Sequence, residues 1–296
     1  MSDKVAIVTG ASSGIGEATA RKLRAMGYQV YAVARRLDRI TPLADIGVRP
    51  VRVDVTDDAA LVGLVEQVLA ESGRVDVLVN NAGYGSYGAV EEVPLDEARR
   101  QFDVNVFGLA RLAQLVLPQM RRQGSGRIIN ISSVGGKIYE PLGGWYHATK
   151  FAVEGLSDSM RMELAPLGID VIVIQPGAIA TEWPAIAGQH LLATSGHGPY
   201  ADQAARSAAI LTVAEAPASP PSVVADAVAR AVRARRPRTR YAVGSGAKVI
   251  LAARRILSDR GFDWFMRTML RSLARVATRY DARQHRLVRE GSTADT

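Results

Sequence analysis

Short apolar runs rich in β-branched residues alternate with longer segments of helical periodicity over the first two-thirds of the chain. The runs are mostly apolar on both faces, which is typical of strands buried under helices in a parallel sheet. The predicted strands are Val5–Thr9, Gln29–Ala34, Val51–Asp54, Val75–Asn80, Gly126–Ile131 and Ile169–Ile174. The helices predicted between them are Ile15–Met26, Asp57–Glu71, Leu95–Gln123 and Trp145–Leu167. Such an alternation predicts a doubly wound α/β fold built on a parallel sheet.

The last third of the chain begins with a connector, residues 214–222, whose prolines prevent a continuous helix. Helical spacing resumes over Val223–Ala234, and Arg240–Val243 is predicted to be the last strand. We therefore expect one α/β domain over residues 1–245 and a helical C-terminal extension over residues 246–296, rather than two domains.

Composition excludes several classes of protein. The 296 residues are 48% hydrophobic, which is enough for a sizeable core. The absence of cysteine excludes disulfides, thiol nucleophiles and cysteine-ligated metals, and with only four histidines we predict no metal site. The N-terminus has no basic segment followed by an apolar stretch, and no run of about 18 uncharged apolar residues occurs. A cytoplasmic protein is therefore expected.

A glycine-rich loop, Thr9-Gly10-Ala11-Ser12-Ser13-Gly14-Ile15-Gly16, follows the first predicted strand and opens the first predicted helix. Glycines let the backbone approach a pyrophosphate, and the free N–H groups of a helix N-terminus attract its charge. An ordinary strand–helix turn is the alternative, but the position in a βαβ unit favours dinucleotide binding. The candidate cofactor contacts here are Gly10, Ser12, Ser13, Gly14, Ile15 and Gly16.

The end of the second predicted strand, Tyr31-Ala32-Val33-Ala34-Arg35-Arg36, indicates which dinucleotide is bound. A carboxylate at this point bonds the ribose 2′-hydroxyl of NAD, whereas an arginine suits the 2′-phosphate of NADP. Here position 34 carries no carboxylate, and Arg35 and Arg36 can fork to phosphate oxygens. The sequence therefore favours NADP(H) over NAD(H), with a pair of solvated arginines as the alternative.

Further motifs follow in order along the chain. They are Asp54-Val55, Asn80-Asn81-Ala82-Gly83, Asn105, Asn130-Ile131-Ser132-Ser133, Tyr146-His147-Ala148-Thr149-Lys150 and Pro176-Gly177-Ala178-Ile179-Ala180-Thr181, each at the end of a predicted strand or in a predicted helix. Together, over residues 4–243, they resemble the short-chain dehydrogenase/reductase family, in its branch with the T-G-x-x-x-G-x-G loop. The resemblance implies a Rossmann fold, with residues 1–245 as a dinucleotide-binding catalytic domain.

The chemistry of these residues agrees with the resemblance. Tyr146 and Lys150 are four residues apart on a predicted helix and share one face. A nearby ammonium is expected to lower the Tyr146 pKa from about 10 toward neutrality, so that Tyr146 can act as general acid or base on a carbonyl or alcohol oxygen. Ser133 can hydrogen-bond the same oxygen as charge develops on it. Taken singly, these side chains could equally be core or capping residues.

The resemblance also implies the roles of single residues. It selects Ser133 rather than Ser132, by a spacing of 13 residues from Tyr146. It implies that Lys150 also holds the nicotinamide ribose and that Asn105 orders a water of a proton relay. The other implied cofactor contacts are Asp54 and Val55 at the adenine, Asn81, Ala82 and Gly83 at the ribose, Ser12 and Ile15 near the phosphates, Ile179 and Thr181 at the nicotinamide carboxamide, and Val104, Pro176 and Gly177. A homodimer or homotetramer is common in this family.

Substrate selectivity in this family usually comes from the segment after the sixth strand. The apolar residues there are Trp183, Ile186, Leu191, Leu192, Tyr200, Ile210 and Leu211, near which we also expect Tyr84, Tyr87 and Trp145. Such a pocket suits a hydrophobic ketone or alcohol, although core or oligomer contacts are the alternative. Glycines at 188, 196 and 198 suit a mobile lid, and His190 and His197 are expected on a loop surface. The predicted function is an NADP(H)-dependent oxidoreductase, with a non-catalytic cofactor sensor or scaffold as the alternative.

The net charge of +8 comes from the C-terminal end, because residues 230–296 hold 17 Lys+Arg and five Asp+Glu, whereas residues 1–229 hold 20 and 24. Residues 262–280 show helical apolar spacing, with arginines at 267, 271, 275, 279 and 283 on another stripe. This helix is expected to dock on the substrate entrance or on a partner subunit. Peripheral contact with an anionic membrane is the alternative, and no nucleic-acid partner is expected.

Overall fold

A seven-stranded sheet forms the centre of the computed structural model, which describes residues 4–213 and 218–292, and their side chains except those of 212–213 and 276–292. The strand order is β3-β2-β1-β4-β5-β6-β7, and every adjacent pair is parallel. The strands are β1 (Val5–Thr9), β2 (Gln29–Ala34), β3 (Arg49–Arg52), β4 (Val77–Asn80), β5 (Gly126–Ile131), β6 (Ile169–Pro176) and β7 (Arg240–Val243). The predicted doubly wound parallel α/β fold is confirmed.

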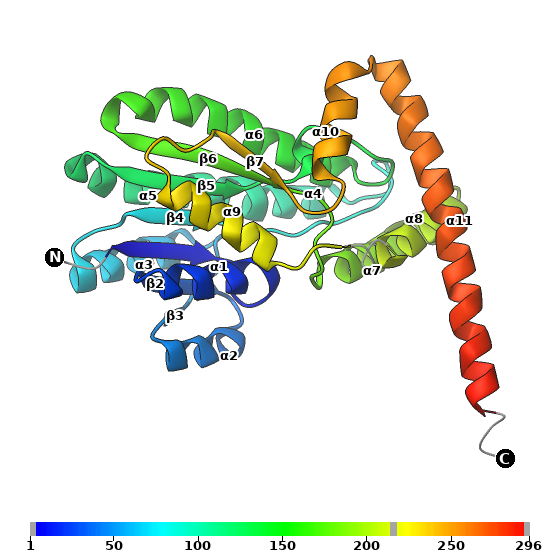
Figure 1. The fold of residues 1–296 in the computed structure, drawn as a ribbon, viewed down its shortest axis with the longest axis horizontal. Helices are drawn as coiled ribbons and strands as arrows, with labels where there is room; N and C mark the ends of the chain where they lie inside the picture. The colour runs from blue at the N-terminus through cyan, green and yellow to red at the C-terminus, as the bar shows by residue number, and fades with distance from the viewer. Residues whose placement is uncertain (1–3, 214–217, 293–296) are drawn as a thin grey trace.

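Helices cover both faces of the sheet (Figure 1). Successive strand residues point to opposite faces, so Ala6 and Val8 of β1 pack toward α1 (Gly14–Ala25) and α9 (Ser222–Arg233). Val5 and Ile7 pack on the other face, toward the helices α3 (Asp58–Ser72), α5 (Gly108–Gln123) and α6 (Gly144–Leu164). Burial on both faces explains why the strand sequences are continuously apolar.

The order of the strands reverses beside β1, because β2 and β3 lie on one side of it and β4 to β7 on the other. At such a point the chain segments that follow β1 and β4 turn away from one another and leave a crevice at the carboxyl ends of the strands. The glycine loop follows β1 and therefore opens into this crevice. The short helices α2 (Leu37–Ile40) and η1 (Thr41–Ile46) lie between β2 and β3, and the short helix η4 (Ala165–Leu167) follows α6.

Three of the predicted strands have ends that differ in the structure. The third strand runs over Arg49–Arg52 rather than Val51–Asp54. It starts earlier because Arg49 pairs with Tyr31 of β2, and it ends earlier because the Asp54 carboxylate accepts hydrogen bonds from the Thr56 N–H and hydroxyl. The fourth begins at Val77, because the Val75 backbone bonds the side-chain amide of Gln123. The sixth continues two residues beyond Ile174 to Pro176, since β7 pairs with those residues.

The helix predicted over Leu95–Gln123 is interrupted. It consists of α4 (Leu95–Phe102), a π-helical turn η2 (Asp103–Phe107) and α5. Asn105 lies in this turn, with its side chain buried between α6 and the segment after β4. Short π-helical turns within α-helices frequently accompany functional sites, and the predicted helix pattern gave no sign of this one.

The segment after β6 forms two helices that periodicity had not indicated, α7 (Trp183–Ser195) and α8 (Ala201–Val213). The extension then forms α10 (Ala247–Ile256) and the long helix α11 (Asp259–Ser292), which passes beside α8 (Figure 1). Phe262 and Met266 of α11 are buried against Ile138. The predicted arginines 279 and 283 lie outside the described side chains.

Candidate active site

A long cleft of about 940 Å³ crosses the carboxyl ends of the strands. Nearly all predicted cofactor and reaction residues line it, namely Gly10, Ser12, Ser13, Gly14, Ile15, Arg35, Arg36, Asp54, Val55, Asn81, Ala82, Gly83, Val104, Ser133, Tyr146, Lys150, Pro176, Gly177, Ile179 and Thr181. Two predicted residues lie just behind it. Gly16 packs so closely that a Cβ atom there would collide with the Gly10 carbonyl, and Asn105 is buried.

The glycine loop is fixed to the neighbouring strand by Thr9 and Asn81. The Thr9 hydroxyl accepts hydrogen bonds from the N–H groups of Asn81 and Ala82, each at 3.0 Å. The Asn81 amide in turn donates to the carbonyls of Thr9 and Gly10, at 3.0 and 3.2 Å. Gly10 adopts a φ of +64°, and a Cβ there would lie 2.9 Å from the Ala82 Cα. The loop must therefore be glycine here to lie against β4.

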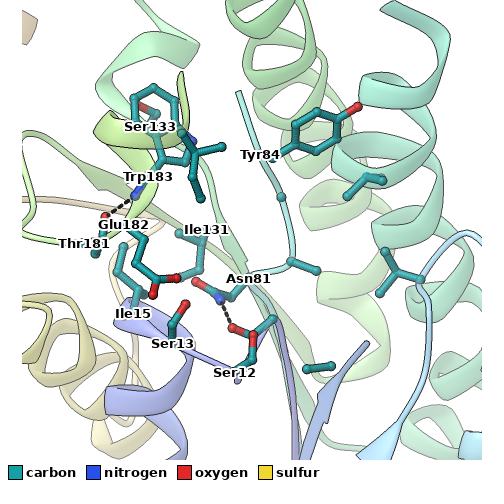
Figure 2. Close-up of a pocket in the computed structure, with 18 of the residues that line it drawn as sticks. Ser12, Ser13, Ile15, Asn81, Tyr84, Ile131, Ser133, Thr181, Glu182 and Trp183 are labelled. Carbon is teal, nitrogen blue, oxygen red and sulfur yellow. Dashed lines mark hydrogen bonds between the residues drawn. The ribbon is translucent and has the colours of Figure 1, made fainter. Parts of the chain in front are cut away.

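Charged side chains gather at the outer end of the cleft. Arg36 donates from Nη2 to the Ser12 and Ser13 hydroxyls, at 3.1 and 3.4 Å. Glu182 approaches from the segment after β6, with its carboxylate 3.6 Å from Arg36 and 3.3 Å from Arg39. Figure 2 shows Glu182 pointing toward Ser12 and Ser13 across the cleft. Arg35 is largely exposed, and its guanidinium lies 3.9 Å from the Asp54 carboxylate.

Tyr146, Ser133 and Lys150 meet at the inner end. The Tyr146 and Lys150 side chains are both buried, and the Lys150 ammonium donates to the Ile131 carbonyl at 3.0 Å. Burial raises the pKa of Tyr146 to about 12, opposed by a hydrogen bond with Ser133 and assisted by the Glu140 carboxylate. Burial lowers the pKa of Lys150 to about 8, opposed by the Glu154 carboxylate.

The expectation that Lys150 lowers the pKa of Tyr146 is therefore wrong for the protein alone. The Lys150 Nζ atom lies 5.9 Å from the centre of the Tyr146 ring, and desolvation of the buried phenol is the main cause of its raised pKa. Sequence spacing placed the two side chains on one face correctly, but it carried no information about burial. Tyr146 in this state is a protonated acid at neutral pH.

Ser133 is positioned by a short turn, η3 (Val134–Gly136), that follows β5. Its hydroxyl accepts a hydrogen bond from the Gly135 N–H at 3.0 Å. The Gly135 carbonyl lies 2.9 Å from Nδ1 of His147, a buried residue beside Tyr146 on α6. His147 therefore connects the turn that carries Ser133 to the helix that carries Tyr146.

Asn105 connects the same helix to the loop after β4. Its amide exchanges hydrogen bonds with the backbone of Tyr84, at 3.0 and 2.9 Å, and donates to the Thr149 hydroxyl at 3.0 Å. Thr149 precedes Lys150 on α6. The buried Asn105 side chain thus links the loop after β4 to helix α6 by hydrogen bonds.

Apolar side chains from α7 and α8 form one wall at the inner end. Trp183 lines the cleft there, and Tyr87, Leu142, Leu191 and Ala204 are buried behind it in the same apolar cluster as Tyr146. Of the other residues predicted for substrate contact, Tyr84, Ile186 and Leu211 line the cleft, whereas Leu192 is exposed. His190 is exposed, as expected, but it lies on helix α7 rather than on a loop and lines the cleft. Glu182 and Glu140 were missed, because single carboxylates in irregular segments carry no sequence signal.

Two further findings bear on function. Among the residues that the structure describes, no group of three or more His, Cys, Asp or Glu side chains is arranged to hold a metal ion. Within the same residues, each helix is too short or too polar to cross a membrane.

Comparisons with known proteins agree with this geometry. Residues 4–189 match the family described as short chain dehydrogenase. The 3-ketodihydrosphingosine reductase of Bacteroides thetaiotaomicron is 38% identical over 253 residues, which cover 85% of this chain and 92% of that protein. The NADPH-dependent 3-dehydrocapnine reductase of Ornithobacterium rhinotracheale is 34% identical over 274 residues, 88% of this chain and 95% of its own.

Solved structures show the same likeness. A short-chain dehydrogenase from Streptomyces avermitilis superposes with a TM-score of 0.76 at 35% identity, covering 94% of this chain and 98% of that one. A metagenomic short-chain oxidoreductase in complex with NADP gives 0.65 at 30% identity, covering 82% and 97%. A Burkholderia phymatum short-chain dehydrogenase/reductase in complex with NAD gives 0.75 at 27%, covering 86% and 92%. With a family match over more than half its length and relatives matched almost in full, the chain belongs to the short-chain dehydrogenase/reductase family of oxidoreductases.

Proposed function

We propose that this protein transfers a hydride between NADP(H) and the carbonyl or alcohol group of a hydrophobic small molecule, with Tyr146 as general acid and base. The observation that carries the proposal is the continuity of one cleft. It has the glycine loop and two arginines at its outer end, and Tyr146, Ser133 and Lys150 at its inner end. In dinucleotide-binding folds the cofactor lies extended along a crevice of this kind, with its adenine at one end and its nicotinamide at the other.

The residues present fit a nicotinamide dinucleotide. A Cβ at Gly10 or Gly14 would come within about 3.0 Å of Ala82 or Thr181, so the glycines keep the floor of the cleft open. The Ser13 side chain does not cap α1, whose first N–H groups are left for a phosphate. Asp54 and Val55 would hold the adenine, Asn81 to Gly83 the adjacent ribose, and Ile179 and Thr181 the carboxamide. When bound, the cofactor supplies or accepts the hydride.

The side chains at the inner end would handle the oxygen and its proton. Ser133 holds the substrate oxygen by a hydrogen bond that strengthens as negative charge develops there. Tyr146, whose raised pKa keeps it protonated, donates its proton to that oxygen during ketone reduction. Lys150 orients the ribose and supplies positive charge beside the phenol. Asn105 holds the loop that follows β4 against helix α6. It would also order a water molecule that returns a proton to Tyr146.

Arg35 and Arg36 support the preference for NADP(H). Both line the cleft at the end of β2, where a 2′-phosphate would lie. Arg36 is held by Ser12 and Ser13, so its guanidinium is already oriented. One relative is named as NADPH-dependent and one similar structure contains NADP, although another contains NAD.

The proposal of a hydrophobic substrate is supported by Trp183, Ile186 and Leu211, the apolar residues of α7 and α8 that line the cleft. The relatives named above are reductases, which favours ketone reduction as the direction. We also propose a cytoplasmic homodimer or homotetramer. In this arrangement residues 246–296 act as an extension that docks on the catalytic domain, as Phe262 and Met266 do, rather than on a membrane. No nucleic-acid partner forms part of this proposal.

A substrate screen that follows nicotinamide absorbance tests the proposal. Aliphatic and aromatic ketones should be reduced with NADPH at a kcat/KM at least tenfold above that with NADH. Equal values for the two cofactors would contradict the assignment of the arginines. Absence of turnover across the panel, with cofactor binding intact, would favour a sensor or scaffold instead.

A further inference from the structure

A carboxylate from the segment after β6 reaches the arginines at the outer end of the cleft. Glu182, the residue before α7, lines the cleft together with Arg36. Its carboxylate lies 3.6 Å from the Arg36 guanidinium and accepts a hydrogen bond of 3.3 Å from Arg39, which is 143 residues away in the sequence. Figure 2 shows the side chain pointing across the cleft toward Ser12 and Ser13. Glu182 thus links the two sides of the cleft by ion pairs.

The residues on either side of Glu182 hold this segment close to the glycine loop. A Cβ atom at Gly14 would lie 3.0 Å from the Thr181 methyl group, so the loop and the segment lie close together. The Trp183 N–H donates to the Thr181 hydroxyl at 3.3 Å, and the Trp183 ring packs against Tyr146 with ring centres 5.1 Å apart. The packing of the whole segment therefore brings the carboxylate to the arginines.

Arg36 is also the best-placed phosphate ligand at the end of β2. Its Nη2 atom, which faces Glu182, donates to the Ser12 and Ser13 hydroxyls. A guanidinium that is already oriented in this way suits the oxygens of a phosphate. Arg35, by contrast, is 74% exposed. A 2′-phosphate bound at this end must therefore share Arg36 with the Glu182 carboxylate or displace it.

Both arrangements weaken the binding of NADP(H). If the phosphate displaces Glu182, the ion pairs with Arg36 and Arg39 are lost, and if Glu182 stays, two anions lie side by side and repel each other. The carboxylate is 46% exposed, so water and salt screen the effect and keep it moderate. NAD(H) carries a hydroxyl in place of the phosphate, so its affinity does not depend on this competition.

We propose that Glu182 is a specificity-determining residue, which competes with the 2′-phosphate of NADP(H) for Arg36 and so limits the discrimination of NADP(H) from NAD(H). The arginines favour the phosphate, and the carboxylate opposite them sets how strongly. This inference rests on the proposed function for the identity of the cofactor, but binding alone tests it, without turnover.

Calorimetric titration of the full chain at pH 7 with NADPH and NADH is the main test. E182Q and E182A should both bind NADPH about three- to tenfold more tightly than the wild type, as the loss of half-exposed ion pairs implies, and NADH within about twofold of it. E71Q is a matched control, because Glu71 near the end of α3 also pairs with an arginine, Arg49, and is not among the described residues that line the cleft. It removes the same charge from the protein and should leave both affinities unchanged.

Adenosine 2′,5′-bisphosphate and AMP repeat the comparison without the nicotinamide. The bisphosphate should gain the same factor in E182Q as NADPH does, and AMP should gain nothing. A folded E182Q that binds NADPH no more tightly than the wild type would overturn the proposal. An equal gain for NADPH and NADH would overturn it too, because the repulsion would then act on the pyrophosphate that both cofactors share.

The outcomes separate the role of Glu182 from the proposed function. If the wild type prefers NADPH and E182Q keeps the same preference, the proposed function stands and the role of Glu182 is wrong. If the gain appears in E182Q but no ketone is reduced, Glu182 has the proposed role and the oxidoreductase function fails. If neither protein binds the cofactors or the bisphosphate, both proposals are wrong.

Discussion

At the scale of single residues, burial governs the candidate site more than charge spacing does. Tyr146 and Lys150 occupy one face of α6, as expected for residues four apart. Both are buried, and burial disfavours the charged form of each, so their pKa values move in opposite directions. In the protein alone, Tyr146 is therefore a protonated phenol, which is the form that donates a proton in ketone reduction.

A pH profile checks this protonation state. Alcohol oxidation needs the tyrosinate, so kcat/KM with NADP should rise between pH 7 and pH 10, because the raised pKa keeps the phenol largely protonated over that window. Ketone reduction uses the protonated phenol and should show no such rise. Removal of the Glu140 carboxylate should move the oxidation profile to lower pH. An oxidation rate that is flat above pH 7 would contradict the assignment.

Sequence reasoning found most single residues of the site because they lie in motifs tied to strand ends. Ser133, Tyr146, Lys150 and the glycines all line or floor the cleft where they were expected. The sequence did not indicate Glu140, Glu182 or His147 as site residues. Their roles depend on neighbours that only the folded chain brings close to them. The pKa of Tyr146 was mispredicted for the same reason.

At the scale of elements, the glycine loop is held in place by close backbone packing as well as by the hydrogen bonds of Thr9 and Asn81. Gly16 on α1 lies against the Gly10 carbonyl and the Asn81 amide. Any side chain there forces α1 away from β1, and the loop that α1 opens must move with it.

Gly16→Ala should therefore lower the free energy of unfolding by about 1–3 kcal/mol, as overpacking does, and weaken NADPH binding. Gly63→Ala is the matched control, because Gly63 lies in helix α3 with no atom within 4 Å of an added Cβ. That change should raise stability by roughly 0.5–1 kcal/mol and leave NADPH affinity unchanged. Denaturant unfolding and fluorescence titration measure both quantities. Equal effects of the two changes would show that the loop packing is unimportant.

Regular elements were predictable where apolar periodicity was strong. All strands were recognised, and the errors at their ends came from side chains such as Gln123 and Asp54 that bond the backbone locally. The π-helical turn at Asn105 and the helices α7 and α8 were not foreseen. A one-residue change of helical register and a segment interrupted by glycines both leave little periodic signal.

At the scale of the whole molecule, the extension is connected to the site through the turn η3. Phe262 is fully buried and packs on Ile138, two residues after that turn, while Tyr139 donates a hydrogen bond to Asp263 at 2.9 Å. Since η3 carries the hydrogen bond to Ser133, a loose extension should loosen the position of Ser133 as well.

Phe262→Ala should cost about 3–5 kcal/mol of the stability of the docked extension and reduce kcat for ketone reduction. Trp264→Ala is its control, because Trp264 on the same helix is 70% exposed and its loss should change stability by no more than about 0.5 kcal/mol. Hydrogen exchange of the η3 amides, together with kcat, measures the coupling. Unchanged exchange and kcat in Phe262→Ala would show that the extension is independent of the site.

The central claim is that Tyr146 exchanges the proton of the reacting oxygen, and Tyr146→Phe tests it most directly. The variant keeps the ring that packs against Tyr87 and Trp183 but loses the hydroxyl. NADPH affinity should stay within about twofold of wild type, while kcat for a ketone found in the screen falls by about 10²–10⁴. A Tyr146→Phe protein that binds NADPH and reduces the ketone at the wild-type rate would contradict the account.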